Sequence, residues 1–329
     1  MNPIIGQHDT NINIFNHSIF LDWFSKIPEQ KKNIILEPFA GSNQIIHLLK
    51  ELNLIQKFSS YDILPREKNV QYLDSFQSFP KGYFTCITNP PFLAKSIARK
   101  KKLNIDFGHY HNLYEKSLSL CLKNCEYVAI ILPDSFLLNL KFSERIDAII
   151  SLNYKFIFTK TEQPVCLALF SQKKSYDFPV YNKDRFLGYY FEKQKEISNF
   201  LSFKNEELPI FFHRLNGNIG LHALDATQKN KKIRFDLPET ISDKDVGLHA
   251  RFRTRILILN PNHQPFHQKQ NLQFIELLNH QLLEYRLKSN DLFLTSFRGL
   301  SEDGNYRKRF DFLTAKQLIY KSYKDFFNL

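Results

Sequence analysis

The sequence predicts an α/β fold, with a doubly wound sheet in the first half of the chain and a smaller α+β domain in the second. Three observations predict it. Short apolar segments alternate with segments of helical periodicity over the first half. The apolar segments show little polar alternation, as expected for strands buried on both faces. Several stop at an acidic or proline-containing turn, where a doubly wound sheet binds its ligands.

The elements follow in chain order. Residues 33–36 are a short apolar strand that stops at Glu37 and Pro38, and residues 42–54 then carry an apolar helical face. Residues 58–62 form a second strand, which closes on an acidic residue. The remaining elements expected in this half are strands at 83–88, 127–133, 156–158 and 165–170 and a helix at 112–122.

The second half has a different composition. Residues 171–190 mix Lys, Asp, Pro and aromatic residues without a long period. We therefore expect a first domain at residues 1–172 and a second at 173–329. The second contains a strand-like run that ends near residue 259 and a helical pattern at 272–287, so it is predicted to be α+β.

Charge and cysteine content indicate the kind of partner and compartment. The formal net charge is +12, of which +4 falls up to Phe170 and +8 after it. An excess of positive charge favours polyanionic partners, although a generally basic proteome gives the same balance. The four cysteines form no C-x-x-C pair, which predicts a reduced, cytoplasmic protein. No signal peptide and no membrane-length apolar stretch is evident, so no membrane partner is expected.

A first chemical cluster follows the first strand. Glu37, Pro38, Phe39, Ala40 and Gly41 form a strand-to-helix turn in which glycine lets a ligand approach the backbone. Asp62 stands 21 residues after Gly41, the interval expected of a carboxylate that binds a ribose hydroxyl. An ordinary strand-to-helix turn with an incidental glycine is the alternative.

A second cluster, more specific than the first, follows the strand at 83–88. It is the tetrapeptide Asn89-Pro90-Pro91-Phe92. The prolines give a rigid turn, so that the Asn89 side-chain oxygen and the Pro90 carbonyl become neighbouring acceptors for an exocyclic amino group. The Phe92 ring offers a face on which a base stacks. A proline strand terminator with a capping asparagine is the alternative.

The two clusters together resemble those of the adenine-N6 DNA methyltransferases of restriction–modification systems. The cofactor motif precedes the catalytic one and a long region follows both, which is similar to the family's gamma arrangement. The resemblance covers roughly residues 15–170. It implies an S-adenosylmethionine-binding domain, a C-terminal target-recognition domain, double-stranded DNA as partner and a flipped adenine as substrate. It further implies the modification enzyme of a type II system, a monomer paired with a restriction endonuclease, and chemistry without a metal.

The resemblance also assigns roles to individual residues. Those on the cofactor loop are Glu37, Phe39 and Gly41, with Asp62 on the ribose and Asp74 on the cofactor adenine. Those on the catalytic segment are Asn89, Pro90 and Phe92. Phe158 is the first choice, and Phe156 the second, for a ring that stacks on the other face of the target base; a plain strand-core position is the alternative for Phe158. The chain departs from the family at Asn43, where a second glycine is usual; asparagine tolerates a positive φ better than most residues, so the turn is expected to persist.

Three basic segments are candidates for DNA contact. Lys100 and Lys101 follow the catalytic turn closely. Alternation along a strand would place Arg251, Arg253 and Arg255 on one face, and arginine forks suit phosphates and guanine edges. The third segment carries the cations Arg298 and Arg307. A solvated charge run and buried ion pairs are the alternatives.

Three other functions compete with DNA methylation. The same tetrapeptide occurs in enzymes that methylate rRNA bases or the side-chain amide of glutamine. A basic DNA-binding module on an inactive α/β scaffold is the third, disfavoured because both chemical clusters are intact. A large basic region after the catalytic domain favours an enzyme that acts on duplex DNA.

Overall fold

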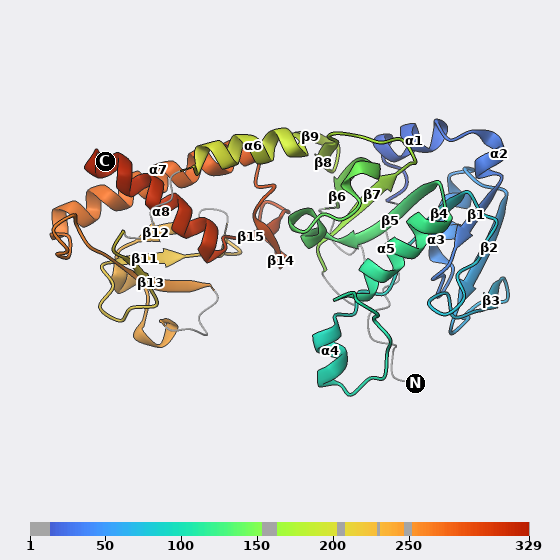
Figure 1. Ribbon diagram of the computed structural model, residues 1–329, viewed down its shortest axis with the longest axis horizontal. Helices are drawn as coiled ribbons and strands as arrows, with labels where there is room; N and C mark the ends of the chain where they lie inside the picture. The colour runs from blue at the N-terminus through green and yellow to red at the C-terminus, as the bar shows by residue number, and fades with distance from the viewer. Residues whose placement is uncertain (1–13, 153–162, 203–207, 229–230, 247–251, 329) are drawn as a thin grey trace. The chain divides into compact units, whose positions relative to one another are not determined.

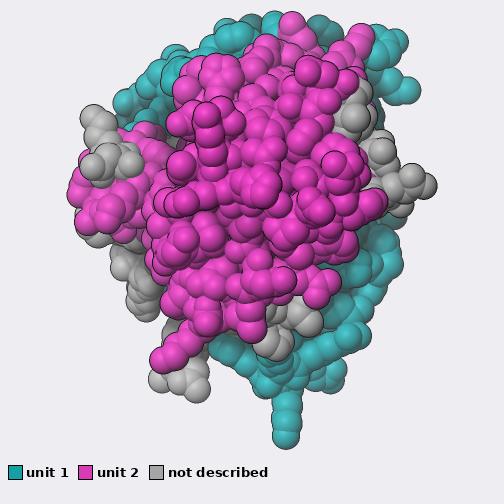
Figure 2. Space-filling model, turned by 90° about the vertical axis from the view of Figure 1, so that its left-hand side faces the viewer, with its two compact units in different colours: residues 1–190 teal, residues 191–329 magenta. Residues whose placement is uncertain are grey.

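The computed structural model describes residues 14–152, 163–202, 208–228, 231–246 and 252–328 (Figure 1). The chain divides into two compact units, Met1–Tyr190 and Phe191–Leu329, coloured separately in Figure 2. The sequence placed the boundary after residue 172. The units divide 18 residues later because two further strands extend the sheet of the first unit.

The first unit is built on a mixed sheet. Within the described residues it has nine strands, in the order β3-β2-β1-β4-β5-β7-β6-β8-β9. The strands from β3 to β5 are parallel, and β7 is antiparallel to both β5 and β6. Their bounds in chain order are β1 (Ile34–Glu37), β2 (Lys57–Asp62), β3 (Val70–Tyr72), β4 (Thr85–Thr88), β5 (Tyr127–Pro133), β6 (Ile146–Ser151), β7 (Val165–Phe170), β8 (Pro179–Asn182) and β9 (Arg185–Tyr189).

Helices cover both faces of this sheet. On one face, apolar side chains of α1 (Ser18–Ser25) and α3 (Gln44–Glu51) share a buried cluster with alternate residues of the central strands, such as Ile87 of β4. On the other face, the Cys86 sulfur of β4 lies 3.7 Å from the Cys121 sulfur of α5 (Leu113–Asn124). The shorter helices are α2 (Glu29–Lys32), α4 (Lys95–Lys100), η1 (Asp134–Leu138) and η2 (Ser143–Arg145).

The predicted doubly wound fold is confirmed. The expected strands at 33–36, 58–62, 83–88, 127–133 and 165–170 correspond to β1, β2, β4, β5 and β7. The helices expected at 42–54 and 112–122 correspond to α3 and α5. The strand expected at 156–158 lies outside the described residues. Strand β6 was not predicted, because Asp147 interrupts its apolar run, and this side chain accepts a hydrogen bond from the Trp23 indole at 3.0 Å.

The second unit is α+β, as expected. Its antiparallel sheet has the order β10-β13-β11-β12, and a separate hairpin pairs β14 with β15. Helices α7 and α8 share a buried core with the sheet. The bounds are α6 (Tyr190–Phe200), which begins at the boundary, β10 (Ile210–Phe212), β11 (Ile219–His222), β12 (Arg234–Asp236), η3 (Pro238–Thr240), η4 (Asp243–Asp245), β13 (Arg253–Ile258), α7 (Gln268–Ser289), β14 (Thr295–Leu300), β15 (Tyr306–Arg309) and α8 (Phe312–Phe327). Among the described helices, none combines the length and apolar composition needed to cross a bilayer.

Candidate active site

Three polar residues meet at one edge of the first unit's sheet. Strand β1 pairs in parallel with β2 on one side and β4 on the other. Glu37 ends β1, Asp62 ends β2 and Asn89 directly follows β4. Because adjacent parallel strands end at the same edge, the register brings these three side chains to one place.

The turn after β1 needs two residues in the left-handed backbone region. Gly41 has φ +53° and Asn43 has φ +56°. The Ala40 N–H donates to the Tyr61 carbonyl at 2.9 Å, and the Asn43 N–H donates to the Ala40 carbonyl at 2.7 Å. Glycine and asparagine adopt this conformation more readily than other residues. The turn therefore forms with asparagine at position 43, as the sequence predicted.

The buried side chain of Asn43 holds the turn against strand β2. It is fully buried, and its amide oxygen accepts a hydrogen bond from the Ser60 hydroxyl at 2.7 Å. This bond links the start of α3 to β2. Asn43 does not line the cavity described below, so its role here is structural.

Glu37 is a buried carboxyl group held by two donors. Its Oε1 accepts hydrogen bonds from the Thr88 hydroxyl at 2.5 Å and from the Phe39 N–H at 3.0 Å, and the residue is 1% exposed. Burial raises the pKa of Glu37 to about 8, although both hydrogen bonds act in the opposite direction. A cation beside Oε2 would favour the carboxylate. The group is therefore suited to bind an ammonium ion.

Asp62 is also buried, and it holds the turns on both sides of the cavity edge. Its Oδ2 accepts the Gly41 N–H at 2.8 Å, and its Oδ1 accepts the Leu64 N–H at 2.7 Å. A carboxylate has about four acceptor positions. Two therefore remain for hydroxyl groups of a ligand.

These side chains line a cavity of about 470 Å³. All five residues predicted to bind a cofactor are in its wall, and so are Asn89 and Pro91 of the predicted catalytic segment. The volume lies within the range of about 300–1,000 Å³ that is usual for small-molecule sites. The structure thus brings together predicted residues that are up to 54 positions apart in the chain.

An aromatic wall faces part of this cavity. The Phe39 and Phe76 rings lie 5.1 Å apart between centroids, and both residues line the cavity with Asp74. The Asp74 carboxylate accepts the Phe76 N–H at 2.9 Å, and the Ser75 hydroxyl donates to the Pro38 carbonyl at 2.7 Å. These bonds fix the segment after β3 against the turn after β1. A flat apolar ring of a ligand would fit against this wall.

Phe76, Lys116 and Asp106 also line the cavity, and none of the three was predicted from the sequence. The Lys116 ammonium binds the Asp106 carboxylate at 3.1 Å and the Asp106 carbonyl at 2.8 Å, and it lies 5.3 Å from the centroid of the Phe76 ring. Phe76 could have been predicted, because it stands only two residues after the predicted cofactor residue Asp74. Nothing in the local sequence distinguishes Lys116 from a solvated helical lysine, because its acidic partner lies in a loop.

The predicted catalytic segment lies partly beside the cavity. Pro90 is buried, and Phe92 is half-buried against the core cluster that α1 and α3 share with the sheet. Neither residue lines the cavity, whereas Asn89 and Pro91 do. Phe158, predicted to stack on a target base, lies outside the described residues.

A projecting segment, residues 94–112, follows the catalytic segment and contains α4 (Figure 1). Its two ends are joined by the Lys95 N–H, which donates to the His111 carbonyl at 2.8 Å. Lys100 and Lys101 are exposed on it. Asn104, Ile105 and Asp106 of the same segment line the cavity. The segment therefore carries exposed cations and part of the cavity wall.

The arginines of β13 are engaged within the protein. Arg255 Nε donates to the Pro238 carbonyl at 2.9 Å, and Arg255 Nη1 lies 2.7 Å from the Asp243 carboxylate. Nη1 also donates to the Leu215 carbonyl, and Nη2 donates to the Ile241 carbonyl. Arg253 is exposed and lies 3.3 Å from Asp245. Arg251 lies outside the described residues. The predicted alternation thus places Arg253 and Arg255 on one face, but the protein itself supplies their partners.

Comparisons with known proteins find similar solved structures but no similar sequences. No family model matches the chain, and no curated protein does. One similar structure is a Listeria monocytogenes protein described as a class I S-adenosylmethionine-dependent methyltransferase, at 14% identity and TM-score 0.38, covering 54% of this chain and 66% of that one. A second is the methyltransferase subunit of a type I restriction–modification system from Streptococcus thermophilus, at 13% identity and TM-score 0.38, covering 60% and 54%. A third is the type IIG restriction endonuclease BpuSI, at 12% identity and TM-score 0.38, covering 74% and 33%.

The chain thus spans less than two thirds of the length of each of these proteins. Because every one of the three TM-scores is below 0.5, the likenesses carry no functional conclusion. The strand order and the two-sided helix packing of the chain itself establish the α/β fold.

Proposed function

We propose that the protein is an S-adenosylmethionine-dependent DNA methyltransferase that modifies the N6 amino group of adenine. One observation carries the proposal: Asn89 and Pro91 line the same cavity as Glu37, Phe39, Gly41, Asp62 and Asp74. A methyl donor bound by the second set would lie beside the segment that accepts the target amino group.

The chemistry of the cavity fits the proposed methyl donor. Glu37 offers a carboxyl oxygen to an ammonium group, and Asp62 offers free acceptor positions to ribose hydroxyls. The wall of Phe39 and Phe76 fits a flat base, next to the Asp74 carboxylate. S-adenosylmethionine has all of these parts, and its sulfonium would supply the methyl group.

The protein's own residues would position the target. The Asn89 side-chain oxygen and the Pro90 carbonyl accept the two N–H groups of an exocyclic amine and orient its nitrogen toward the methyl group. The nitrogen loses a proton only as the new bond forms, so no strong base is needed beforehand. Adenine N6 must leave the duplex to reach this position, which costs a few kcal/mol.

A transfer assay tests the proposal against its competitors. Duplex DNA, ribosomal RNA and a protein extract are incubated separately with the full chain and S-adenosylmethionine labelled with tritium in the methyl group. We expect label in DNA, recovered as N6-methyladenine after digestion. Label in RNA, or in the glutamine side chains of a protein, would identify that molecule as the substrate in place of DNA. Absence of label in all three, with the cofactor bound, would support a binding module on an inactive scaffold.

A further inference from the structure

We propose that the projecting segment, residues 94–112, binds the duplex beside the flipped adenine, through the cations at the end of α4 and the apolar side chain of Ile97. The inference rests on the proposed function and describes how the same site engages its substrate. A solvated charge run is the alternative, and the position, anchoring and surroundings of the segment each count against it. The cations are Arg99, Lys100, Lys101 and Lys102.

The projecting segment lies beside the place that a target base must reach. It begins two residues after Phe92, the last residue of the catalytic tetrapeptide. Its residues 104–106 line the same cavity as Asn89 and Pro91. An adenine that is methylated at Asn89 must leave its duplex and enter this cavity. The duplex from which it comes would therefore lie against the projecting segment.

The base of the segment is fixed to the rest of the first unit. The Leu113 N–H donates to the Leu93 carbonyl at 2.9 Å, where the segment begins and ends. Both side chains share a buried cluster with Ala98 of α4 and with Phe107. The helix thus packs through Ala98 and leaves its other sides to solvent. An element anchored in this way loses little conformational entropy on binding.

The segment carries positive charge that the protein does not neutralise. Residues 94–112 contain five cationic side chains and one acidic one, a net of +4. The acidic residue is Asp106, whose carboxylate lies 3.1 Å from the ammonium group of Lys116, outside the segment. Within the described residues, the side chains of the four cations named above are exposed and make no ion pair or hydrogen bond. Their charge is therefore available to an anionic partner.

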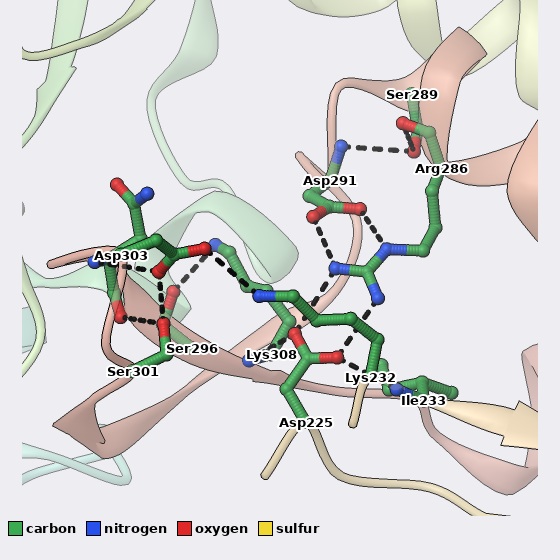
Figure 3. A network of polar contacts seen from close by, with 11 residues as sticks. Asp225, Lys232, Ile233, Arg286, Ser289, Asp291, Ser296, Ser301, Asp303 and Lys308 are labelled. Carbon is green, nitrogen blue, oxygen red and sulfur yellow. Dashed lines mark hydrogen bonds and ion pairs between the residues drawn. The ribbon is translucent and has the colours of Figure 1, made fainter. Parts of the chain in front are cut away.

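The second unit shows the opposite arrangement (Figure 3). Arg286 of α7 binds both oxygens of Asp225, at 3.0 and 3.1 Å, and one of its nitrogens lies 2.7 Å from the Asp291 carboxylate. The Lys232 ammonium lies 3.1 Å from the Asp303 carboxylate. These cations serve the fold and have carboxylate partners, whereas the four of the projecting segment have none among the described residues.

Exposed apolar side chains lie among the cations of the segment. Ile97 is 44% exposed, Leu103 38% and Ile105 37%. Ile97 precedes Lys100 and Lys101 by three and four residues, so these three side chains lie on one face of α4. Exposed apolar groups that gather beside polar ones mark interaction surfaces. Cations that bind phosphates, with an apolar side chain for the base step that a flipped adenine leaves unstacked, fit a duplex at this place.

Duplex DNA fits this surface better than an anionic membrane does. Helix α4 has only six residues, less than two turns, so it cannot lay a long apolar face on a bilayer. The segment also forms part of the cavity wall, which a membrane anchor does not require. RNA phosphates would attract the same cations, so an RNA duplex is an arm of the test.

A double variant of the full chain, Lys100→Ala with Lys101→Ala, tests the cations by fluorescence anisotropy. The probe is a fluorescein-labelled 30-base-pair DNA duplex of mixed sequence, titrated at several salt concentrations. Each lost phosphate contact lowers the slope of log K against log salt by about one unit, so we expect a decrease of about two units. At about 0.1 M salt this corresponds to binding that is roughly 10- to 100-fold weaker.

A second variant, Ile97→Ala, tests the apolar contact. We expect binding at least about fourfold weaker, which is what one buried CH2 group contributes. The salt slope should stay that of the wild type, because an apolar contact releases no counterions. The matched control is Lys57→Ala with Lys123→Ala, which removes the same charge at the start of β2 and in the last turn of α5. We expect this control to bind as the wild type does.

The outcomes separate the proposals. Thermal unfolding and S-adenosylmethionine binding are measured for each variant to establish that the fold is intact. Wild-type duplex binding by the Lys100 and Lys101 double variant or by Ile97→Ala would overturn the inference, and so would an equal loss in the control. Tighter wild-type binding to a 30-base-pair RNA duplex, or to phosphatidylserine vesicles, would also overturn it. A wild type that binds the duplex through these residues but does not label DNA in the transfer assay would count against the proposed function instead.

Discussion

Two regions carry residues that the sequence predicts to be functional. One is the sheet edge formed by the carboxyl ends of the neighbouring strands β2, β1 and β4, and the other is the arginine-bearing face of β13. At the sheet edge, Glu37, Asp62 and Asn89 share one cavity, and the Asp62 carboxylate keeps two acceptor positions for a ligand. On β13, the Arg255 guanidinium is taken up by main-chain carbonyls and Asp243. The motifs at the ends of parallel strands correctly predicted which residues lie together in a cavity. The repeated arginines of the antiparallel strand β13 correctly predicted only that their side chains lie on one face of the strand.

The difference has a physical origin. The ends of adjacent parallel strands are brought together by the sheet itself, so a local motif is enough to place its residues. An arginine on a strand has five donors, and any nearby carbonyl or carboxylate can satisfy them. Whether it is available to a ligand depends on residues distant in the sequence.

Asn89→Ala is expected to have the largest effect. Its side-chain oxygen acts on the target amine and not on the methyl donor, so turnover should fall by about two orders of magnitude or more, as on loss of a transition-state contact. The cofactor Kd should stay within a few-fold of the wild-type value. Single-turnover methylation and calorimetry check the two quantities. Lost cofactor binding with normal turnover of the bound fraction would contradict the assignment.

Asp62→Ala is expected to raise the cofactor Kd by about one to two orders of magnitude, because a charge-assisted hydrogen bond contributes roughly 1.5–3 kcal/mol. The residue also holds the Gly41 N–H. Asp62→Asn is therefore the matched control, because it retains one acceptor for that turn. An unchanged Kd in both variants, measured by calorimetry, would show that the carboxylate serves the turn alone.

Glu37 makes cofactor affinity and stability depend on pH in opposite ways. Its pKa is raised to about 8, so the free protein holds a proton there at pH 7. Binding an ammonium group requires the carboxylate, so affinity should fall by up to about tenfold per unit as the pH drops from 8 toward 6. Calorimetry over this range checks the slope, which Glu37→Gln should abolish. Equal slopes in the two proteins would contradict the pairing.

The same variant should stabilise the free protein. The folded-state pKa lies above the unfolded value of 4.5, so the folded state holds an extra proton between pH 4.5 and about 8. Stability therefore decreases as the pH rises through this window. Glutamine cannot ionise, and it keeps an oxygen for the donors Thr88 and Phe39. Thermal melting at pH 8 should show a higher Tm for Glu37→Gln; a lower Tm would mean that the carboxylate is stabilised in the free fold.

The sequence was sufficient for the central strands and for the cavity residues that follow them, because both depend on local signals. The apolar runs that lead to Glu37, Asp62 and Asn89 define the strands, and the ends of these runs give the position of the cavity. The edge hairpin β8–β9 was missed because its strands contain mixed polar and aromatic residues, as half-exposed edge strands do.

The cavity residue Lys116 could not be predicted for a related reason. Its partner Asp106 is ten positions away, in a loop whose path the sequence does not specify. The engagement of Arg255 with the carbonyls of Leu215, Pro238 and Ile241 likewise depends on tertiary contacts. Periodicity gives the face on which a side chain lies, but it does not give the partner across that face.

The smallest functional effect is expected at Arg255. Replacing it by alanine removes a guanidinium that binds several main-chain carbonyls and is only 16% exposed. We expect the free energy of unfolding to fall by about 2–4 kcal/mol, since hydrogen bonds to charged groups contribute roughly 1.5–3 kcal/mol each. Duplex binding of the folded fraction should change by less than about threefold, a loss below the roughly 1 kcal/mol of one base-edge contact. Urea unfolding and anisotropy with the 30-base-pair duplex measure the two effects, with the exposed Arg253→Ala as control. A stable Arg255→Ala protein that no longer binds the duplex would make β13 the DNA-contacting element and remove the contrast drawn between the two regions.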